Sequence, residues 1–544
     1  MRLTPDDLPD DAETLKAMIL AARADNARLD AERARLAHEG EVLAAEVDRL
    51  TAQNERLDHI VSVLRRAQFG RRSEKISDDQ IELALEDVET AFGVEDAAIE
   101  QAEPIARREG TEARRANRGQ LPKHLPREEV VIAPAATSCP CCGGDLHVIG
   151  EDVSERLDKV PATLRVIVTR RPKYACRTCD RTGADGATGV IQAPAPPRLI
   201  LGGLPTEALV ADVLVAKYAD HLPLYRQSQI LAREGVNISR STLAGWVGFA
   251  AHELAPLHER LVMHLRASEK LFADETRCPV LDPGRGKTKT GYLWAIARDD
   301  RSWGGADPPA VAYMYAPGRG AEHAVRLLAG FSGILQVDGY AAYDALSDGD
   351  RADGPATLAL CWSHFRRRFY DIAKAGNAPI ASEALDHIGT LYAIETDIRG
   401  RSAAERREER QARARPIVDA LKPWLEAQLT RVSGRAPIAE AMRYGLSRWE
   451  GLGRFLDDGR IEIDTNVVER TIRPIALNRK NALFAGSDEG GANWAIIASL
   501  IETAKLNGVN PQAWLTDTLE KLVNRWPASR IADLMPWAYA NTAA

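Results

Sequence analysis

Two acidic residues follow short apolar stretches that have the composition of buried strands. Asp274 comes directly after residues 271–273 (LFA), and Asp338 comes directly after residues 334–337 (ILQV). A buried carboxylate without a partner is costly, so each acid would need a hydrogen-bond donor, a cation or a metal ion. Two neighbouring carboxylates repel each other, and Mg²⁺ between them would turn this repulsion into binding. The alternative is structural, because acids at strand ends also begin turns and cap helices.

A third acid from a nearby helix would complete a two-metal site for in-line attack on phosphate. The stretch DTNVVERTIRP (464–474) supplies two candidates, Glu469 and Asp464. Glu469 lies four residues before Arg473, so both side chains would share one face of a helix. Asn466 is a candidate cap of that helix. The residues alone leave the choice between the two acids open.

Basic residues accompany these acids along the sequence. His364 precedes three arginines at 366–368, and four further cations follow Glu469 between residues 470 and 480. A catalytic cleft for DNA needs cations that hold phosphates, whereas a solvated basic helix face is the structural alternative. His364 either assists proton transfer or caps a helix. The predicted phosphate-binding residues of this region are Arg367, Arg470, Arg473, Arg479 and Lys480.

Five of the seven cysteines lie between residues 139 and 179. Cys139 and Cys142 form one C-x-x-C pair, Cys176 and Cys179 form a second, and 33 residues lie between the pairs. Two such pairs match a structural Zn²⁺ site with four thiolate ligands, here in a domain expected at 129–186. The alternating apolar residues between the pairs predict a β-ribbon. Cys141 could replace Cys142 as a ligand, and a redox C-x-x-C is the alternative, although nothing nearby resembles a thioredoxin unit.

The order of elements after residue 269 predicts how the acids are positioned. Three strands are expected at 270–276, 287–299 and 309–317, followed by alternating helices and strands. This order fits a ribonuclease-H-like α/β core, in which an antiparallel three-strand meander continues into parallel strands with crossover helices. The first and fourth strands are neighbours there, so Asp274 and Asp338 would be adjacent. We expect this core at 269–382 and 456–505, a helical insertion at 383–455 and a C-terminal helical tail at 506–544.

An all-α segment expected at 204–268 contains the layout of a helix-turn-helix. Its first helix would end at Gly235, and Ser239 can cap the second. Base edges are usually met at the N-terminal end of the second helix, and an ordinary helical hairpin is the alternative. The predicted base-contacting residues are Arg240, Ser241 and Thr242. The Pro- and Gly-rich residues 187–203 are expected to form a linker.

Leucine recurs six times at seven-residue spacing, beginning at Leu29, within one long helix expected at 11–69. This spacing is typical of a coiled coil, and Asn26 and Asn54 at core positions favour a parallel pair of chains. We therefore expect a homodimer or a higher oligomer, with a helix packed on its own domain as the alternative. A charge-segregated linker is expected at 70–128, acidic first and basic afterwards.

The bulk composition limits the class of protein. The 544 residues exceed one compact core, so a multidomain protein is expected. The net charge of −7 argues against a globally basic DNA-coating protein and confines any nucleic-acid surface to local patches. No apolar run has membrane-spanning length and the N-terminus lacks a signal pattern. We therefore expect a cytoplasmic, nucleoid-associated protein without a membrane partner.

Together these pieces resemble the large transposases of the insertion-sequence-66 family, over about residues 60–520. Thr465 departs from the family pattern, which often has two Asn after the Asp that precedes the catalytic Glu. The motifs that carry the resemblance are LRRAQFGRRSEKI, CPCCGG, YACRTC, KYADHLPLYRQ, SRSTLAGWVG, ADETRCPVLDPGRGKTKTGYLWAIARD, VDGYAAYDAL, CWSHFRRRF and DTNVVERTIRPIALNRKNALFAGSDEG.

The resemblance implies that Asp274, Asp338 and Glu469 are the Asp-Asp-Glu triad of a DDE transposase. It also implies Mg²⁺ dependence (Mn²⁺ could substitute), terminal inverted repeats and target DNA as substrates, and two small accessory proteins. Metal-activated water would free a 3′-hydroxyl at the element's end, and that hydroxyl would attack target DNA. The rival functions are a ribonuclease-H-like nuclease or resolvase, which cuts without joining, and a non-catalytic zinc and coiled-coil DNA-binding regulator.

Overall fold

The computed structural model describes residues 11–69, 163–175, 190–200, 203–282 and 287–543. The chain divides into two compact units, Met1–Ala162 and Thr163–Ala544, and each is treated by itself. The four predicted zinc ligands and the charged linker expected at 70–128 lie outside the described residues. No helix among the described residues is long and apolar enough to cross a membrane.

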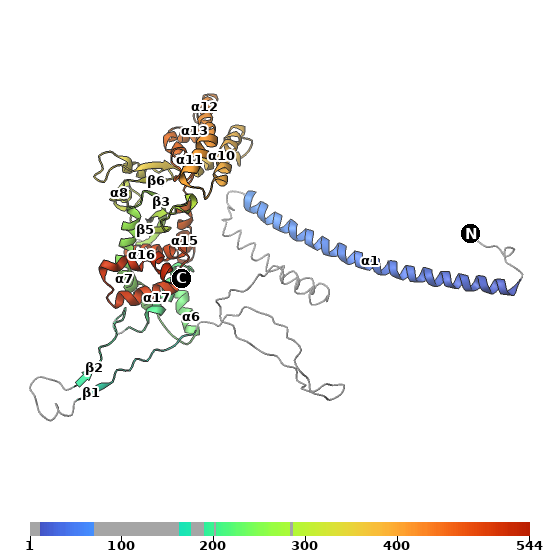
Figure 1. The fold of residues 1–544 in the computed structure, drawn as a ribbon, viewed down its shortest axis with the longest axis horizontal. Helices are drawn as coiled ribbons and strands as arrows, with labels where there is room; N and C mark the ends of the chain where they lie inside the picture. The colour runs from blue at the N-terminus through green and yellow to red at the C-terminus, as the bar shows by residue number, and fades with distance from the viewer. Residues whose placement is uncertain (1–10, 70–162, 176–189, 201–202, 283–286, 544) are drawn as a thin grey trace, which may run out of the picture. The chain divides into compact units, whose positions relative to one another are not determined.

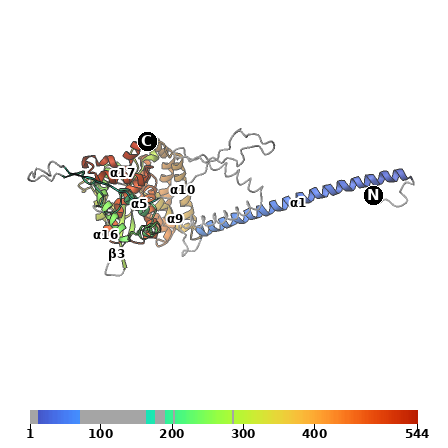
Figure 2. The same ribbon diagram turned by 90° about the horizontal axis from the view of Figure 1, so that it is seen from below.

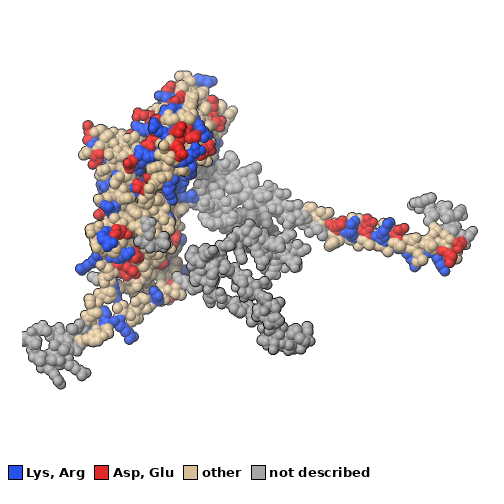
Figure 3. Space-filling model, in the orientation of Figure 1, with Lys and Arg blue, Asp and Glu red and all other residues tan. Residues whose placement is uncertain are grey.

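The first unit contains one long helix, α1 (Ala12–Phe69), which confirms the single helix predicted over 11–69. Its leucine seam is solvent-exposed in the part whose side chains are described, with Leu29 and Leu36 both 55% exposed and Leu43 65% exposed. Lys and Arg alternate with Asp and Glu along the same helix (Figure 3). Exposed leucines at heptad spacing on a charged helix are typical of a surface that pairs with another helix.

The second unit is built on a five-stranded mixed sheet. Along the chain β3, β4 and β5 form an antiparallel meander, and β6 and β7 add to β3 in parallel, in the order β5-β4-β3-β6-β7. The order of strands predicted from the sequence is therefore present. The strands are β3 (Lys270–Asp282), β4 (Lys287–Arg298), β5 (Ala310–Ala316), β6 (Ile334–Val337) and β7 (Thr357–Leu360).

Strand β3 runs further than the sequence predicts, because its pairing with β4 continues to Asp282 opposite Lys287. Short helices connect the later strands, and the one after β6 is a 3-10 helix rather than an α-helix. The connections are α8 (Ala321–Leu327) before β6, η4 (Ala341–Ser347) after it, and α9 (Trp362–Ala373) after β7.

The β5 edge of the sheet is covered by α16 (Asp488–Leu506), as Figure 1 shows. Ser499 Oγ accepts a hydrogen bond from Tyr313 N at 2.7 Å, and Thr503 Oγ1 accepts one from Val311 N at 3.1 Å. A sheet edge with free amides would pair with other chains, so these two hydroxyls close it. Helix α15 (Asn466–Ala482) packs on β3 and β4.

The helical insertion expected at 383–455 is confirmed as helical and lies beyond the β6 side of the sheet (Figure 1). It has its own apolar core, which includes Phe365 and Phe369 of α9, so α9 joins the insertion to the sheet. Its helices are α10 (Pro379–Asp397), α11 (Ala403–Glu409), α12 (Arg415–Arg431), α13 (Pro437–Leu446) and α14 (Trp449–Gly453), with a π-helical turn, η5 (Arg410–Ala414), between α11 and α12.

The helical hairpin predicted before the sheet is present. Helix α6 (Leu224–Arg233) is followed by a turn at Gly235, and Ser239 caps α7 (Arg240–Arg266) by accepting from Thr242 N at 3.1 Å. Helix α5 (Glu207–Tyr218) precedes the hairpin and packs on α17 (Pro511–Val523), as Figure 2 shows. After α17 come η7 (Ala528–Leu534) and α18 (Pro536–Ala543).

Only residues 163–175 of the predicted β-ribbon between the cysteine pairs fall within the described part of the chain. Residues 163–172 carry no strand, and the ribbon is instead β1 (Lys173–Ala175) paired antiparallel with β2 (Val190–Gln192). The linker expected at 187–203 was therefore wrong in part. Its residues Gln192 and Ala193 bond to Arg171, so the strand that pairs with β1 comes after the second cysteine pair.

Candidate active site

Asp274 and Asp338 lie at the same level of two neighbouring parallel strands. The last paired residues of β3 and β6 are Phe272 and Gln336, and each acid comes two residues later. Side chains two residues apart on a strand point to the same face. Asp274 and Asp338 therefore occupy equivalent places on their two strands, each two residues after a residue of the same pair. The sequence prediction that the first and fourth strands are neighbours is confirmed.

Glu469 lies in the first turn of α15, next to the start of α9. Thr465 Oγ1 donates a hydrogen bond to Glu469 Oε1 at 3.0 Å, and His364 Nδ1 lies 3.8 Å from the same oxygen. Thr465 is buried, whereas the side chains of His364 and Glu469 are about one-third exposed. The residue that departs from the family pattern therefore holds the carboxylate of Glu469 directly.

Asp338 and Glu469 both act electrostatically on Asp274. Burial raises the pKa of Asp274 to about 8, with further increases from the carboxylate of its neighbour Glu275 and from Asp338 and Glu469. A buried carboxylate facing other carboxylates favours either protonation or a bound cation. The site is therefore poised to bind positive charge.

Asp464, the competing third acid, is occupied differently. Its carboxylate accepts hydrogen bonds from Asn466 N at 3.1 Å and from Asn466 Nδ2 at 2.7 Å. Burial raises its pKa, and Glu462 and Glu469 raise it further. These hydrogen bonds to Asn466, the first residue of α15, indicate that Asp464 stabilises the start of that helix.

Glu275 is an acid that the sequence analysis missed. Its side chain is fully buried, Arg319 Nε donates to its Oε1 at 2.6 Å, and Tyr343 OH donates to its Oε2 at 2.8 Å. Arg319 thus neutralises the acid next to Asp274. The only signal in the sequence was the Asp-Glu dipeptide, because Arg319 lies 44 positions away.

The predicted DNA-binding residues are distributed over three places. Arg367 is exposed and lines a groove beside Asp338. Arg470, Arg473 and Lys480 are exposed on α15, whereas Arg479 is half-buried and donates to the carbonyl of Arg277 on β3. Arg240, Ser241 and Thr242 are exposed at the N-terminal end of α7.

Two kinds of metal donor meet at Glu469. Carboxylate oxygens of the three acids are the hard donors that Mg²⁺ and Mn²⁺ prefer, so this donor set fits such ions. One ligand atom each of Cys361, His364 and Glu469 lies within 4.8 Å of the others. Burial raises the pKa of the Cys361 thiol to about 11, and its sulfur is a soft donor, unlike the oxygen donors that Mg²⁺ and Mn²⁺ prefer.

Family models match segments along most of the chain. The model described as "Transposase IS66 family" matches residues 202–493, more than half of the chain. A "zinc-finger binding domain of transposase IS66" matches 136–180, which includes both cysteine pairs. An "IS66 C-terminal element" matches 499–537, and a model described as "Transposase C of IS166 homeodomain" matches 56–130.

Three similar proteins come from Sinorhizobium fredii (strain NBRC 101917 / NGR234), and each is described as an uncharacterized protein. The protein y4qI is 47% identical over 545 residues, which cover 98% of both chains. The protein y4jD is 45% identical over 486 residues, covering 88% of this chain and 93% of its own. The protein y4hP is 36% identical over 502 residues, covering 89% of this chain and 88% of its own.

Proposed function

The chain belongs to the IS66 family of transposases, and from this premise we propose that it catalyses metal-dependent 3′-end cleavage and strand transfer of an insertion sequence. The proposed metal ligands are Asp274, Asp338 and Glu469. The observation that carries the proposal is the placement of Asp274 and Asp338 just beyond the last paired residues of two neighbouring parallel strands, and Glu469 supports it by raising the pKa of Asp274. Carboxylates so arranged suit two divalent cations in an in-line displacement at phosphorus.

The proposed catalytic core is ribonuclease-H-like and comprises residues 269–382 and 456–505, with the helical insertion between them. The sheet order, with three antiparallel strands continued by two parallel ones, supports this proposal. In such a core the acids of the first and fourth strands face one substrate phosphate, and a helix beyond the sheet supplies the third acid.

The proposed reaction has two steps at phosphorus. A water oxygen bonds to the phosphorus at the element's end while the bond from phosphorus to the 3′-oxygen breaks, leaving a 3′-hydroxyl and a 5′-phosphate. That 3′-oxygen then bonds to a target phosphorus and displaces the target's own 3′-oxygen. In each step the attacking oxygen gives a proton to solvent and the displaced 3′-oxygen takes one up. Bound Mg²⁺ or Mn²⁺ would lower the pKa of the attacking oxygen and offset the charge on the phosphate.

The protein's own residues would keep this geometry fixed. Thr465 holds one oxygen of Glu469, so the other oxygen can turn toward a cation. Arg319 neutralises Glu275, which limits the repulsion that Asp274 must overcome when it ionises. Arg367, exposed beside Asp338, is placed to hold a phosphate of the bound strand.

The other segments are proposed to bind DNA and to assemble the protein. Zn²⁺ would be held by Cys139, Cys142, Cys176 and Cys179, in the segment that matches the zinc-finger domain. The hairpin of α6 and α7 would meet the terminal inverted repeats through Arg240, Ser241 and Thr242. Helix α1 would pair two protomers so that both ends of the element meet, and two small accessory proteins of the same element are expected partners.

A pair of DNA assays tests the proposal. The parent chain is expected to nick supercoiled plasmid and to join pre-cut element ends to target DNA when Mg²⁺ or Mn²⁺ is present. The variant Asp338→Asn should lose both activities, whereas Asp419→Asn, which removes an exposed carboxylate on α12, should keep both. Joining of ends by Asp338→Asn would refute the assignment, and nicking without joining by the parent would favour a nuclease or resolvase.

A further inference from the structure

A groove of about 620 Å³ opens beside Asp338, between the catalytic sheet and the helical insertion. Helix α9 forms one wall, and the end of α13 with the residues that follow it forms the other. The groove residues that matter below are Asp338, Gly339, Arg367, Arg368, Tyr444 and Arg448. The insertion therefore contributes directly to the surroundings of a proposed metal ligand.

Two guanidinium groups lie over the ring of Tyr444 in this groove. The Arg368 Cζ atom is 3.8 Å and the Arg448 Cζ atom 4.4 Å from the ring centroid. The negative face of an aromatic ring attracts such cations. A stacked guanidinium uses its flat face for the ring and keeps its in-plane N–H donors for other groups, and these donors match the geometry of a phosphate.

The cations of the groove are weakly neutralised by the protein. Arg368 pairs with Glu440 at 3.7 Å, and the Glu440 side chain is 75% exposed. Within the described residues no acid forms an ion pair with Arg448, which contacts Ser447 Oγ at 3.1 Å and the Gly339 carbonyl at 3.4 Å. The groove also contains the acids Asp338 and Asp371, but its three arginines outnumber them, and an open groove with excess positive charge suits a polyanionic ligand.

The same wall contacts the loop that holds Asp338. Tyr444 OH donates a hydrogen bond to the Asp338 carbonyl oxygen at 2.7 Å. Gly339 has a φ of +89°, and a Cβ there would lie 3.1 Å from both Tyr444 OH and Arg448 Nε. A glycine is therefore required both by the backbone conformation and by the close approach of the insertion.

We infer that this groove binds the phosphodiester backbone of the DNA strand next to the reacting phosphate, with Arg368 and Arg448 as phosphate ligands, and that Tyr444 is a positioning residue for Asp338. The inference rests on the proposed function, because it takes DNA as the substrate of the neighbouring acids. It assigns to the helical insertion a role in holding substrate. Binding of the strand and placement of Asp338 would then depend on the same side chain.

Salt dependence of DNA binding tests the phosphate contacts. Full-length protein is titrated with a fluorescent mixed-sequence duplex in EDTA, which removes metal-dependent chemistry, at several salt concentrations. The logarithm of the DNA association constant falls as the logarithm of the salt concentration rises. Each lost phosphate contact should make this fall less steep by about 0.9. Arg448→Gln and Arg368→Gln should each show this loss, and Arg448→Lys should keep most of the slope because it keeps the charge.

Arg431→Gln is the matched control, because Arg431 is an exposed arginine of the same insertion that does not line the groove. It should bind with the parental slope. Thermal melting of each variant checks that the fold is retained. Parental slopes in both Arg448→Gln and Arg368→Gln would overturn the phosphate assignment.

Tyr444→Phe separates positioning from binding. It keeps the ring under both guanidinium groups and removes only the hydroxyl that bonds to Asp338. DNA affinity in EDTA should stay within about twofold of the parent, while the rate of plasmid nicking with Mg²⁺ should fall about tenfold or more. An unchanged nicking rate would overturn the positioning role.

These outcomes are distinguishable from a failure of the proposed function. If the parent and Asp338→Asn nick plasmid equally, the acids are not catalytic, whatever the groove binds. If the parent nicks but the arginine variants bind with parental salt dependence, the groove inference fails and the proposed function stands.

Discussion

Gln336 and Glu462 exchange two hydrogen bonds. Gln336 Nε2 donates to the Glu462 carbonyl at 2.8 Å, and Glu462 N donates to Gln336 Oε1 at 2.8 Å. Gln336 is fully buried in β6, two residues before Asp338, and Glu462 lies shortly before α15, which carries Glu469. A side-chain amide thus pairs with the backbone as a neighbouring strand would, and it fixes the path from β6 to the third acid.

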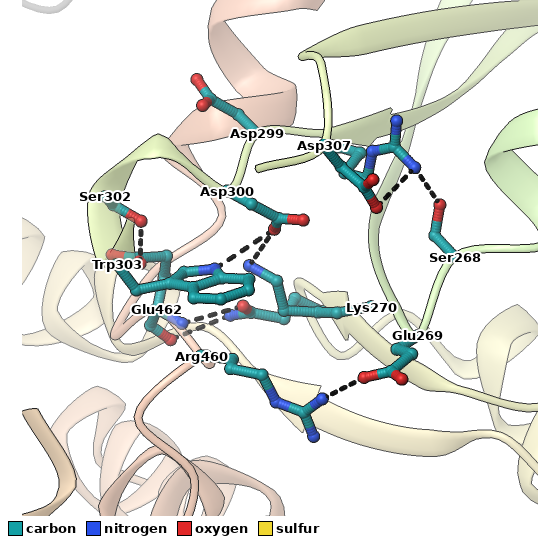
Figure 4. A network of polar contacts seen from close by, with 12 residues as sticks. Ser268, Glu269, Lys270, Asp299, Asp300, Ser302, Trp303, Asp307, Arg460 and Glu462 are labelled. Atoms are coloured by element: carbon teal, nitrogen blue, oxygen red, sulfur yellow. Dashed lines mark hydrogen bonds and ion pairs between the residues drawn. The ribbon is translucent and has the colours of Figure 1, made fainter. Parts of the chain in front are cut away.

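The carboxylate of Glu462 extends this link to the insertion. Figure 4 shows it beside Ser302, whose Oγ donates to it at 2.6 Å, and Arg406 of α11 pairs with it at 2.8 Å. Lys270, at the beginning of β3, and Asp300, two residues after the end of β4, form an ion pair at 3.3 Å next to it. The segment before α15 is therefore held by the sheet and by the insertion together.

Gln336→Leu is expected to destabilise the second unit, Thr163–Ala544. The substitution leaves the amide and the carbonyl of Glu462 without these partners, and a buried unsatisfied group costs about 1–3 kcal/mol. The urea concentration at which half of the second unit is unfolded should fall, and the rate of plasmid nicking should fall with it. Gln428→Leu, on α12 away from the active site, should change neither, and an unchanged midpoint for Gln336→Leu would contradict the role given to this pair.

Asp274→Asn is expected to stabilise the metal-free protein at high pH. The folded-state pKa of Asp274, about 8, lies above its ordinary value of 3.8, so the folded state binds more protons than the unfolded state between these values. Stability is therefore lost as pH rises from about 4 to about 8. In EDTA the melting temperature of Asp274→Asn should exceed that of the parent at pH 8.5 and match it more closely at pH 5.

Added Mg²⁺ provides the second readout for the same variant. It should raise the melting temperature of the parent at pH 8.5, because a ligand that binds only the folded state stabilises it. Asp274→Asn should lose most of this shift, and Asp419→Asn should keep it. An equal Mg²⁺ shift in the parent and Asp274→Asn would show that Asp274 is not a ligand.

Thr465→Val is expected to lower the rate of nicking rather than the affinity for DNA. The change keeps the shape of the side chain and removes the hydroxyl that donates to Glu469 Oε1. A loose carboxylate should slow nicking by about tenfold, since small misplacements of catalytic groups are costly. Thr465→Ser keeps the donor and should keep most of the rate; equal loss in both variants would argue against the hydrogen bond.

The sequence predicts the placement of the two strand-end acids because the signal for it is local. An apolar run followed by an acid occurs at Asp274 and at Asp338, and the order of strands makes them neighbours. Glu469 is different, since 130 residues separate it from Asp338 and Asp464 is an equal candidate by type. The choice of Glu469 rested on the resemblance to a family.

The contacts that surround the acids could not be read from the sequence. Tyr444 forms a hydrogen bond with Asp338 although 106 positions separate them in the sequence, and Arg319 forms one with Glu275 at a separation of 44 positions. Neither Tyr444 nor Arg319 belongs to a sequence motif with a characteristic spacing. The partner of each residue is determined by how the helices pack on the sheet. Composition and periodicity identify the insertion as helical but leave open which of its side chains face the groove.

The last prediction concerns His258 of α7, whose Nε2 lies 3.0 Å from the Tyr313 carbonyl of β5. Burial lowers the pKa of His258 to about 4, only partly offset by this hydrogen bond, from an ordinary value of 6.5. The imidazole is therefore neutral in the folded protein and donates Nε2–H to the carbonyl. Between pH 6.5 and about 4 the unfolded chain binds a proton that the folded chain does not, so stability falls as pH falls through this window.

His258→Gln should flatten this pH dependence, because an amide can donate to the same carbonyl and does not titrate. Urea midpoints measured between pH 7 and pH 4.5 should fall more steeply in the parent than in the variant, with the difference equivalent to about one proton. His221 and His264 also have lowered pKa values, mainly through burial, and their contributions cancel when the two proteins are compared. Parallel pH profiles for the parent and His258→Gln would show that the contact between α7 and β5 does not depend on a neutral imidazole.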